Sequence, residues 1–302
     1  MQEPHIGDET AVAQSKETTI PTIGFGTYRT GGYECYNAVS EALERGYTHI
    51  DTAMAYENEA AVGRAIEQSD VDRDDLFLTT KIKGYPELVE HDRLLEAAQG
   101  CLERLGTDYV DLLLVHWWNP AADMAETFRA MDTLVDEGLV DQIGVSNFSV
   151  DQTRRAMNLA DAPIATNQIE YHAYYGDQDV IKFCQDNDIT VTAYSPLAEG
   201  RLVGHEVLES IGDRYGKSSA QVAIRWLIQQ ENVVTIPKTV TPDHMTANLD
   251  VFDFDLTDGE MQEIRDIEEP FWPRENRKGG YVHQARGMVG SLVPDSLYDR
   301  IA

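Results

Sequence analysis

Residues 49–59 read His49-Ile50-Asp51-Thr52-Ala53-Met54-Ala55-Tyr56-Glu57-Asn58-Glu59, a short β-like run that leads into a loop of small and polar residues. The run stops at the Asp51 carboxylate, and Tyr56 follows on the loop. A carboxylate at the end of a strand and a tyrosine on the next loop can face the same cavity. Because Asp before Thr-Ala is also common at the start of a helix, capping is the alternative role for Asp51.

Two later apolar runs end in the same way. Residues 76–81, Leu76-Phe77-Leu78-Thr79-Thr80-Lys81, end in a cation, and residues 110–116, Val110-Asp111-Leu112-Leu113-Leu114-Val115-His116, end in an imidazole. Short, nearly continuous apolar runs are typical of strands that are buried on both faces. Successive strands are therefore expected to place Asp51, Lys81 and His116 at their C-terminal ends.

The unit of a strand followed by a helix recurs along the chain. Strand-like runs end near Thr27, Asp51, Lys81, His116, Asn147, Glu170, Ser195 and Lys238. Helical patterns lie at 36–45, 94–105, 125–137, 150–159, 177–187 and 220–230, and Gly46 is the expected C-cap of the first of them. This alternation predicts a parallel sheet with right-handed crossovers.

A closed barrel and an open doubly wound sheet both fit that alternation. The open sheet commonly carries Gly-x-Gly-x-x-Gly after its first strand, whereas the expected first strand, 20–28, contains Gly24-Phe25-Gly26 followed by Thr27 and Tyr28. We therefore predict an α/β fold, a (β/α)8 TIM barrel, with residues 1–302 as one domain. An N-terminal arm or covering strand is expected over 1–18, and a segment that closes the barrel mouth over 270–302.

In such a barrel the active site lies at the C-terminal ends of the strands. Polar residues gather at these ends in the present chain: Asp51, Lys81, His116, Ser146-Asn147, Asn167-Gln168, Tyr194-Ser195 and Lys238. Each of them singly could cap a helix, satisfy backbone groups or lie at a core edge. Their common position favours one functional cleft.

The charge is strongly unbalanced, because 53 acidic residues face 24 basic ones and give a formal net charge of -29. Such a surface repels nucleic acid and anionic membranes, so neither is expected as a partner. The acids are spread through segments expected to be helical (67–75, 123–136 and 255–269) rather than gathered into one tail. This distribution predicts the solvated surface of a halophilic protein.

The cysteines Cys35, Cys101 and Cys184 are widely separated and lack Cys-x-x-Cys spacing. This pattern predicts neither a disulfide framework nor a thiolate metal site. It favours a reducing compartment. The chain also lacks a long apolar run and an apolar leader near residue 1. We expect a cytoplasmic monomer.

The pattern Asp51-Thr52-Ala53-x-x-Tyr56-x-Asn58-Glu59, together with Lys81 and His116, resembles the aldo-keto reductase family in its short-loop prokaryotic form. Further matching stretches are Gly24-Phe25-Gly26-Thr27, Gly144-Val145-Ser146-Asn147-Phe148, Asn167-Gln168-Ile169-Glu170-Tyr171-His172, Tyr194-Ser195-Pro196-Leu197 and Ile236-Pro237-Lys238-Thr239. The resemblance implies carbonyl reduction with a nicotinamide cofactor. It also implies a catalytic tetrad of Asp51, Tyr56, Lys81 and His116.

The resemblance further implies where that cofactor binds. Ser146, Asn147 and Gln168 would hold the nicotinamide carboxamide, Tyr194 would stack on its ring, and Lys238 would meet the adenosine phosphate. The other positions assigned to the cofactor are Gly26, Thr27, Ser195, Leu197, Thr239, His244 and Asn248. His244 and Ala247 stand where the family commonly has an arginine and an acidic residue. NADPH is therefore the expected cofactor, with discrimination weak enough to leave use of NADH open.

Reduction of a carbonyl requires a proton donor at the oxygen where negative charge grows. Tyr56 is the expected donor, although a free phenol has a pKa of about 10. A lysine cation about 4 Å away, at an effective dielectric of about 20, would lower that pKa by about three units. We therefore expect Lys81 to bring the Tyr56 pKa toward neutrality, Asp51 to hold Lys81, and His116 to orient the carbonyl.

Other interpretations remain open. Lys81 and Asp51 could form a structural ion pair, and His116 could be a core histidine. Lys81 could form a Schiff base in an aldolase-type barrel, although this needs a neutral amine, which Asp51 opposes. The barrel could also bind its cofactor as a redox sensor or accessory subunit, against which the complete tetrad argues.

The substrate is expected to be a small aldehyde or ketone, including sugar-derived ones, held by an aromatic wall of Tyr28, Trp117 and Trp118. The loop after His116 is short and departs from the Trp-Pro that more usually follows the histidine in the family. Core packing is the alternative role for Trp118.

Overall fold

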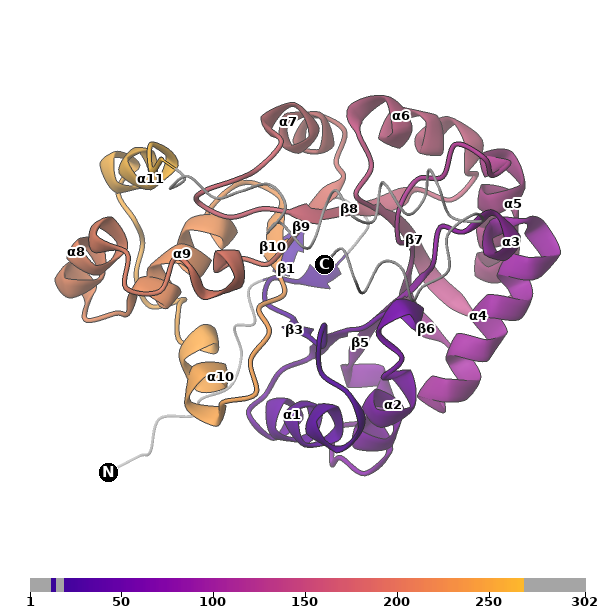
Figure 1. Ribbon diagram of the computed structural model, residues 1–302, viewed down its shortest axis with the longest axis horizontal. Helices are drawn as coiled ribbons and strands as arrows, with labels where there is room; N and C mark the ends of the chain where they lie inside the picture. The colour runs from indigo at the N-terminus through magenta and orange to yellow at the C-terminus, as the bar shows by residue number, and fades with distance from the viewer. Residues whose placement is uncertain (1–11, 15–18, 269–302) are drawn as a thin grey trace, which may run out of the picture.

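The computed structural model describes residues 12–14 and 19–268 of the chain (Figure 1). Strands β1 (Val12–Gln14) and β2 (Thr19–Pro21) pair in antiparallel fashion and form a small sheet of their own. The predicted arm over 1–18 therefore contains a strand. Its remaining residues, and the predicted mouth segment 270–302, lie outside the described residues.

The second sheet has eight parallel strands, and strands that are neighbours along the chain are neighbours in the sheet. These strands are β3 (Phe25–Gly26), β4 (His49–Asp51), β5 (Phe77–Ile82), β6 (Val110–Val115), β7 (Val140–Ser146), β8 (Ile164–Glu170), β9 (Thr190–Tyr194) and β10 (Val233–Thr235). The sheet closes on itself, because Ile23 bridges Thr235 and the Gly24 amide donates to the Thr235 carbonyl at 2.8 Å. The predicted (β/α)8 barrel is confirmed, and the open sheet is excluded.

Helices surround this barrel (Figure 1). They are α1 (Gly32–Glu44), α2 (Glu59–Glu67), α3 (Pro86–Val89), α4 (His91–Leu105), α5 (Met124–Asp136), α6 (Val150–Leu159), α7 (Gln178–Asp186), α8 (Glu206–Tyr215), α9 (Ser219–Ile228), α10 (Pro242–Leu249) and α11 (Asp258–Arg265). Helix α8 packs against α9, and α11 packs against α8, so this side of the barrel carries extra layers. In the described residues, no helix has the length and apolar character needed to cross a membrane.

The barrel separates two apolar cores. The larger core lies between the strands and the surrounding helices and includes Val39, Ile50 and Phe128. The smaller one contains Ile20, Leu112, Leu114, Ala165 and Val234, with Phe77 packed against it. Because Phe77 is the first residue of β5, Ile20 of the β1–β2 hairpin fills the barrel at the end where strands begin. The opposite end, where strands stop, is the end available for a site.

Gly144 shows how tightly the barrel interior is packed. A Cβ atom at Gly144 would lie 2.7 Å from Leu114 Cδ2 and 2.8 Å from the Thr166 carbonyl oxygen. The register between β7 and β8 shifts at the same place, between Ile143 and Val145. This shift sets which residues of β7 and β8 reach the barrel mouth together.

Two local predictions were wrong. The expected strand over 20–28 is divided, because β2 pairs with β1 in the small sheet and β3 pairs with β4 in the barrel, with a bend at Thr22 between them. The expected helix over 67–75 is absent, since α2 ends at Glu67 and only a 3-10 turn, η2 (Arg73–Asp75), follows. Arg73 anchors that turn by donating to Asp111, at 2.8 Å, and to the carbonyls of Leu76 and Tyr109.

Candidate active site

The ends of β4 and β5 bring a carboxylate and an ammonium together inside the barrel. Lys81 Nζ donates to Asp51 Oδ1 at 2.6 Å and to the Thr52 carbonyl oxygen at 2.8 Å. Both side chains are buried, with exposed fractions of 0% for Lys81 and 2% for Asp51. The next helical turn, η1 (Met54–Tyr56), has Ala53 at its N-cap position and no side-chain cap. Asp51 therefore pairs with Lys81, and the capping alternative is excluded.

Tyr56 ends η1 and faces this ion pair. Lys81 Nζ lies 5.1 Å from the centroid of the Tyr56 ring. The same ring contacts His116 edge-on, with centroids 5.8 Å apart, and Tyr28, with centroids 5.1 Å apart. The structure thus brings together the four residues of the predicted tetrad, with Tyr28 beside them.

The electrostatics of Tyr56 differ from the expectation. Burial, and then the Asp51 carboxylate, raise the pKa of Tyr56 well above its ordinary value. The Lys81 ammonium is engaged by Asp51, and the net shift of the Tyr56 pKa is upward. The predicted pKa near neutrality is wrong for this structure. Tyr56 holds its proton, which is the form that a proton donor requires.

Burial also acts on the lysine. It lowers the pKa of the Lys81 ammonium, while Asp51 and then Glu59 act in the opposite direction. Glu59 is itself buried, accepts a hydrogen bond of 2.6 Å from the Thr80 hydroxyl and pairs with Arg104 at 2.7 Å. Carboxylates on both sides of β5 therefore favour the charged form of Lys81.

His116 follows β6 and is held through its backbone. Its amide donates to the Ile82 carbonyl at 3.0 Å, and its carbonyl accepts from Asn147 Nδ2 at 3.1 Å. The next residue, Trp117, is buried and packs against the His116 ring with centroids 4.8 Å apart. Trp118 instead contacts Phe148 edge-on, with centroids 5.4 Å apart. Of the predicted aromatic wall, Tyr28 and Trp117 adjoin the tetrad and Trp118 packs toward β7.

A second polar group lies at the ends of β7, β8 and β9. Tyr194 donates from its hydroxyl to Asn147 Oδ1 at 2.9 Å, Asn147 Nδ2 donates to Ser146 Oγ at 3.0 Å, and Ser146 Oγ donates to the Gln168 carbonyl at 2.9 Å. Gln168 Nε2 then donates to Asp51 Oδ2 at 2.8 Å. The residues predicted to hold a carboxamide are thus connected to the tetrad by hydrogen bonds.

The other predicted cofactor residues are spread around the mouth. Gly26 packs against the Ile236 carbonyl, and Thr27 is buried and donates to the Asp51 carbonyl at 3.0 Å. Ser195 and Leu197 are partly buried on the loop after β9, where Ser195 has a φ of 53°. Beyond β10, Lys238 and His244 are exposed, Thr239 is partly buried, and Asn248 is buried and faces the Tyr47 hydroxyl. The structure therefore does not gather all of these residues at one point.

Asn58 belongs to the site, although the sequence alone predicted no role for it. Its buried Nδ2 donates to the carbonyls of Thr27 and Thr30, both at 2.9 Å, and its Oδ1 accepts from the Thr52 hydroxyl at 2.7 Å. It thus ties the loop that carries Tyr28 to the loop that carries Tyr56. The sequence feature that could have indicated this role is a polar residue two positions after Tyr56, just before α2.

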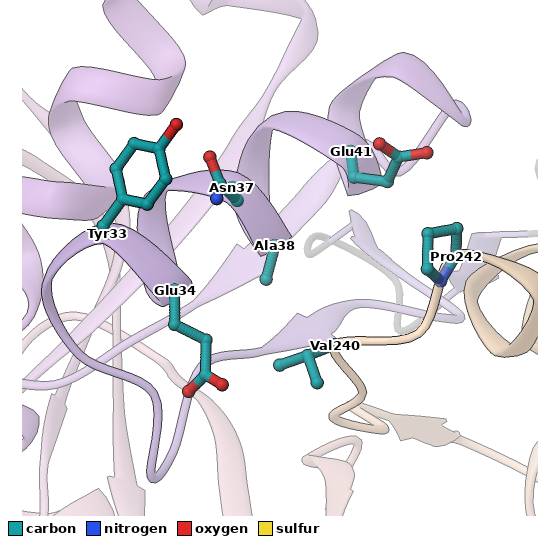
Figure 2. Close-up of a pocket in the computed structure, with 7 residues that line it drawn as sticks. All are labelled: Tyr33, Glu34, Asn37, Ala38, Glu41, Val240 and Pro242. Atoms are coloured by element: carbon teal, nitrogen blue, oxygen red, sulfur yellow. The ribbon is translucent and has the colours of Figure 1, made fainter.

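A surface hollow lies apart from this site. It has a volume of about 400 Å³ and is lined by α1, by the segment before α10 and by the first residue of α10: Tyr33, Glu34, Asn37, Ala38, Glu41, Val240 and Pro242 (Figure 2). None of the tetrad residues lines it. The hollow is therefore separate from the candidate catalytic centre.

Known proteins are similar to this chain in sequence and in architecture. A profile of the aldo/keto reductase family matches residues 22–269. Glyoxal reductase of Bacillus subtilis strain 168 is 38% identical over 247 residues, which cover 81% of this chain and 88% of that protein. Methylglyoxal reductase DkgA of Escherichia coli strain K12 is 35% identical over 267 residues, which cover 87% of this chain and 95% of that protein.

Solved structures of aldo-keto reductases have the same architecture as this chain. MGS-M4, an aldo-keto reductase from a Medee basin deep-sea metagenome library, superposes with a TM-score of 0.81 at 40% identity, covering 87% of this chain and 97% of that one. An aldo-keto reductase of Bombyx mori in complex with NADP superposes with a TM-score of 0.77 at 32% identity, covering 84% of this chain and 91% of that one. With the barrel and the arrangement of Asp51, Tyr56, Lys81 and His116, these matches establish that the chain belongs to the aldo/keto reductase family.

Proposed function

We propose that this protein reduces a small aldehyde or ketone to the alcohol with NADPH and that Tyr56 donates the proton. The observation that carries the proposal is the position of the Lys81 ammonium, which Asp51 fixes at 2.6 Å and which lies 5.1 Å from the centroid of the Tyr56 ring. This arrangement places a cation beside a phenol that keeps its proton. It suits a donor that becomes negative only during the reaction.

Lys81 would act after proton transfer begins. As Tyr56 gives its proton to the carbonyl oxygen, the phenolate that forms is stabilised by the nearby ammonium, by about 3 kcal/mol at about 5 Å and an effective dielectric of about 20. Asp51 and the Thr52 carbonyl prevent that ammonium from turning away. His116, whose ring contacts Tyr56, would donate to the carbonyl oxygen and orient it.

The residues at the ends of β7, β8 and β9 fit a nicotinamide. Ser146, Asn147 and Gln168 form a connected set of donors and acceptors that suits a carboxamide, and the Tyr194 ring beside them suits a planar heterocycle. When bound, the reduced nicotinamide supplies the hydride. Gly26, Thr27, Ser195 and Leu197 would line the path of the cofactor, and Lys238, Thr239, His244 and Asn248 would serve its adenosine end.

The similarity to known proteins favours a small carbonyl substrate for this chain, because two of the relatives are named as glyoxal and methylglyoxal reductases. Tyr28 and Trp117 adjoin Tyr56 and His116 and would enclose such a substrate. Trp118, which packs on Phe148, would support this wall from behind.

Turnover is the direct test. Oxidation of NADPH would be followed spectrophotometrically with glyoxal, methylglyoxal and a panel of aldehydes and ketoses in high salt. Turnover supports the proposal, whereas NADPH binding without turnover of any of them contradicts it and favours a sensor or accessory subunit. Inactivation by borohydride only in the presence of a carbonyl compound would instead support a Schiff base on Lys81.

A further inference from the structure

Lys83 is a partly buried cation that is not part of the catalytic tetrad. Within residues 12–14 and 19–268, the other Arg and Lys side chains that are not exposed all donate hydrogen bonds to oxygen atoms: Arg73, Lys81, Arg201, Lys217 and Arg225. In that part of the chain Lys83 has no hydrogen-bond or ion-pair partner. The contrast is informative because acidic residues outnumber basic ones by 53 to 24.

The register of the barrel places Lys83 beside His116. Lys81 pairs with Leu114 and Ile82 with Val115, and the Ile82 carbonyl accepts from the His116 amide at 3.0 Å. One further step past the last residues of both strands would set Lys83 level with His116. The two chain segments run close together there, because a Cβ at Gly84 would lie 2.1 Å from the Trp117 carbonyl oxygen.

The alternation of β5 gives the direction of the Lys83 side chain. Thr79 contacts His49 at 3.0 Å and Lys81 contacts Asp51, so both face the barrel interior. Thr80 donates a hydrogen bond to Glu59, and Ile82 belongs to the core between the strands and the helices. Thr80 and Ile82 therefore face outward. This alternation, continued one residue past the end of β5 at Ile82, would turn Lys83 inward, about 7 Å nearer the mouth than Lys81.

Lys83 also lies across the mouth from Tyr194, whose ring is proposed to stack on the nicotinamide. In the closed order of the barrel, β5 is four strands from β9 in either direction, so it lies opposite Tyr194. A cation in this place can meet a group on the substrate rather than on the nicotinamide. An anionic substrate would need such a group, because the net charge of -29 otherwise repels it.

We propose that Lys83 binds an anionic group of the substrate, so that this enzyme prefers carbonyl compounds that carry a carboxylate or a phosphate. The proposal rests on the proposed carbonyl reduction and adds the substrate class. Lysine suits this role as a point charge with freely rotating donors. Contact with the anion persists at high salt, whereas repulsion by the distant acids is screened.

The test compares charged substrates with neutral partners of similar shape. One pair is glyoxylate and glyoxal, and a longer pair is 4-formylbenzoate and its methyl ester. In Lys83→Met, kcat/KM for the anion should fall about tenfold through KM while the neutral partner changes less than about twofold. Lys83→Arg should keep the preference, and Lys182→Met, an exposed lysine of α7, should leave both rates unchanged.

Outcomes separate the two proposals. Neutral aldehydes reduced normally, with no change in the ratio for either pair in Lys83→Met, would overturn the role of Lys83 and leave carbonyl reduction standing. A readout without turnover is the binding of benzoate by calorimetry, which should weaken about tenfold in Lys83→Met. Equal benzoate affinity in wild type and variant would likewise overturn the role of Lys83.

Discussion

The Thr52 hydroxyl donates a hydrogen bond of 2.7 Å to the Asn58 carboxamide oxygen, and both residues lie on the loop between β4 and α2 that carries Tyr56. The carbonyl of the same Thr52 accepts from Lys81 at 2.8 Å, and Asn58 Nδ2 holds the carbonyl of Thr27, the residue before Tyr28. One buried carboxamide therefore connects the residue that holds the ammonium to the loop that carries Tyr28, whose ring contacts the ring of Tyr56.

Replacement of Asn58 by alanine is expected to lower both stability and activity. Two buried carbonyls lose their donor, which should lower the free energy of unfolding by about 2–3 kcal/mol. Urea denaturation at fixed salt measures this change, and kcat/KM at a permissive temperature should fall further than the folded fraction. Asn37→Ala, at an exposed position of α1, is the control. A loss below about 0.5 kcal/mol would contradict the role of Asn58.

The pH dependence of reduction follows from the raised pKa of Tyr56. The protonated phenol is the active form, so activity is lost only when the pH rises through that raised pKa. We expect kcat for reduction to show no loss from ionisation of Tyr56 between about pH 6 and 9.5. A pH profile of kcat with a basic limb near pH 7 to 8 would show that the phenol ionises much earlier than its surroundings imply.

The acidic surface predicts a requirement for salt. The Debye length falls from about 10 Å at 0.1 M to about 3 Å at 1 M, so molar salt removes most repulsion among the excess negative charges. The melting temperature should rise between 0.1 M and 2 M potassium chloride and rise less with sucrose, which does not screen charge. Equal melting temperatures in the two salt concentrations would refute the halophilic interpretation.

His244 predicts modest discrimination between cofactors. It is exposed on α10, and an imidazole offers a phosphate fewer donors than the planar, permanently charged guanidinium of an arginine. The ratio of kcat/KM for NADPH to that for NADH should therefore be modest in the wild type, and it should rise in His244→Arg. A large preference that the arginine leaves unchanged would assign recognition to Lys238 alone.

The barrel and the tetrad could be predicted because each depends on local patterns. Apolar runs that end in Asp51, Lys81 and His116 identify strands by their composition, and parallel strands place their ends together. The division of residues 20–28 could not be predicted, because it depends on the pairing of β2 with β1 and of β3 with β4, which arises only in the folded chain.

The pKa of Tyr56 and the role of Asn58 could not be predicted from the sequence either. The pKa near neutrality was expected for Tyr56 from the effect of Lys81 alone. In the folded protein, burial and Asp51 raise the Tyr56 pKa instead. The role of Asn58 likewise depends on carbonyls about 30 positions earlier in the chain, at Thr27 and Thr30, which no local pattern connects to it.

The most direct measurement is the activity of Tyr56→Phe. The substitution removes only the hydroxyl, and the proposed nicotinamide contacts lie on other strands, so the dissociation constant for NADPH should change less than about threefold while kcat for reduction falls by at least about a hundredfold. Lys81→Met should lose activity similarly and also lose stability, because Asp51 is left buried without its cation. Turnover by Tyr56→Phe within tenfold of wild type would contradict the assignment of Tyr56 as the proton donor.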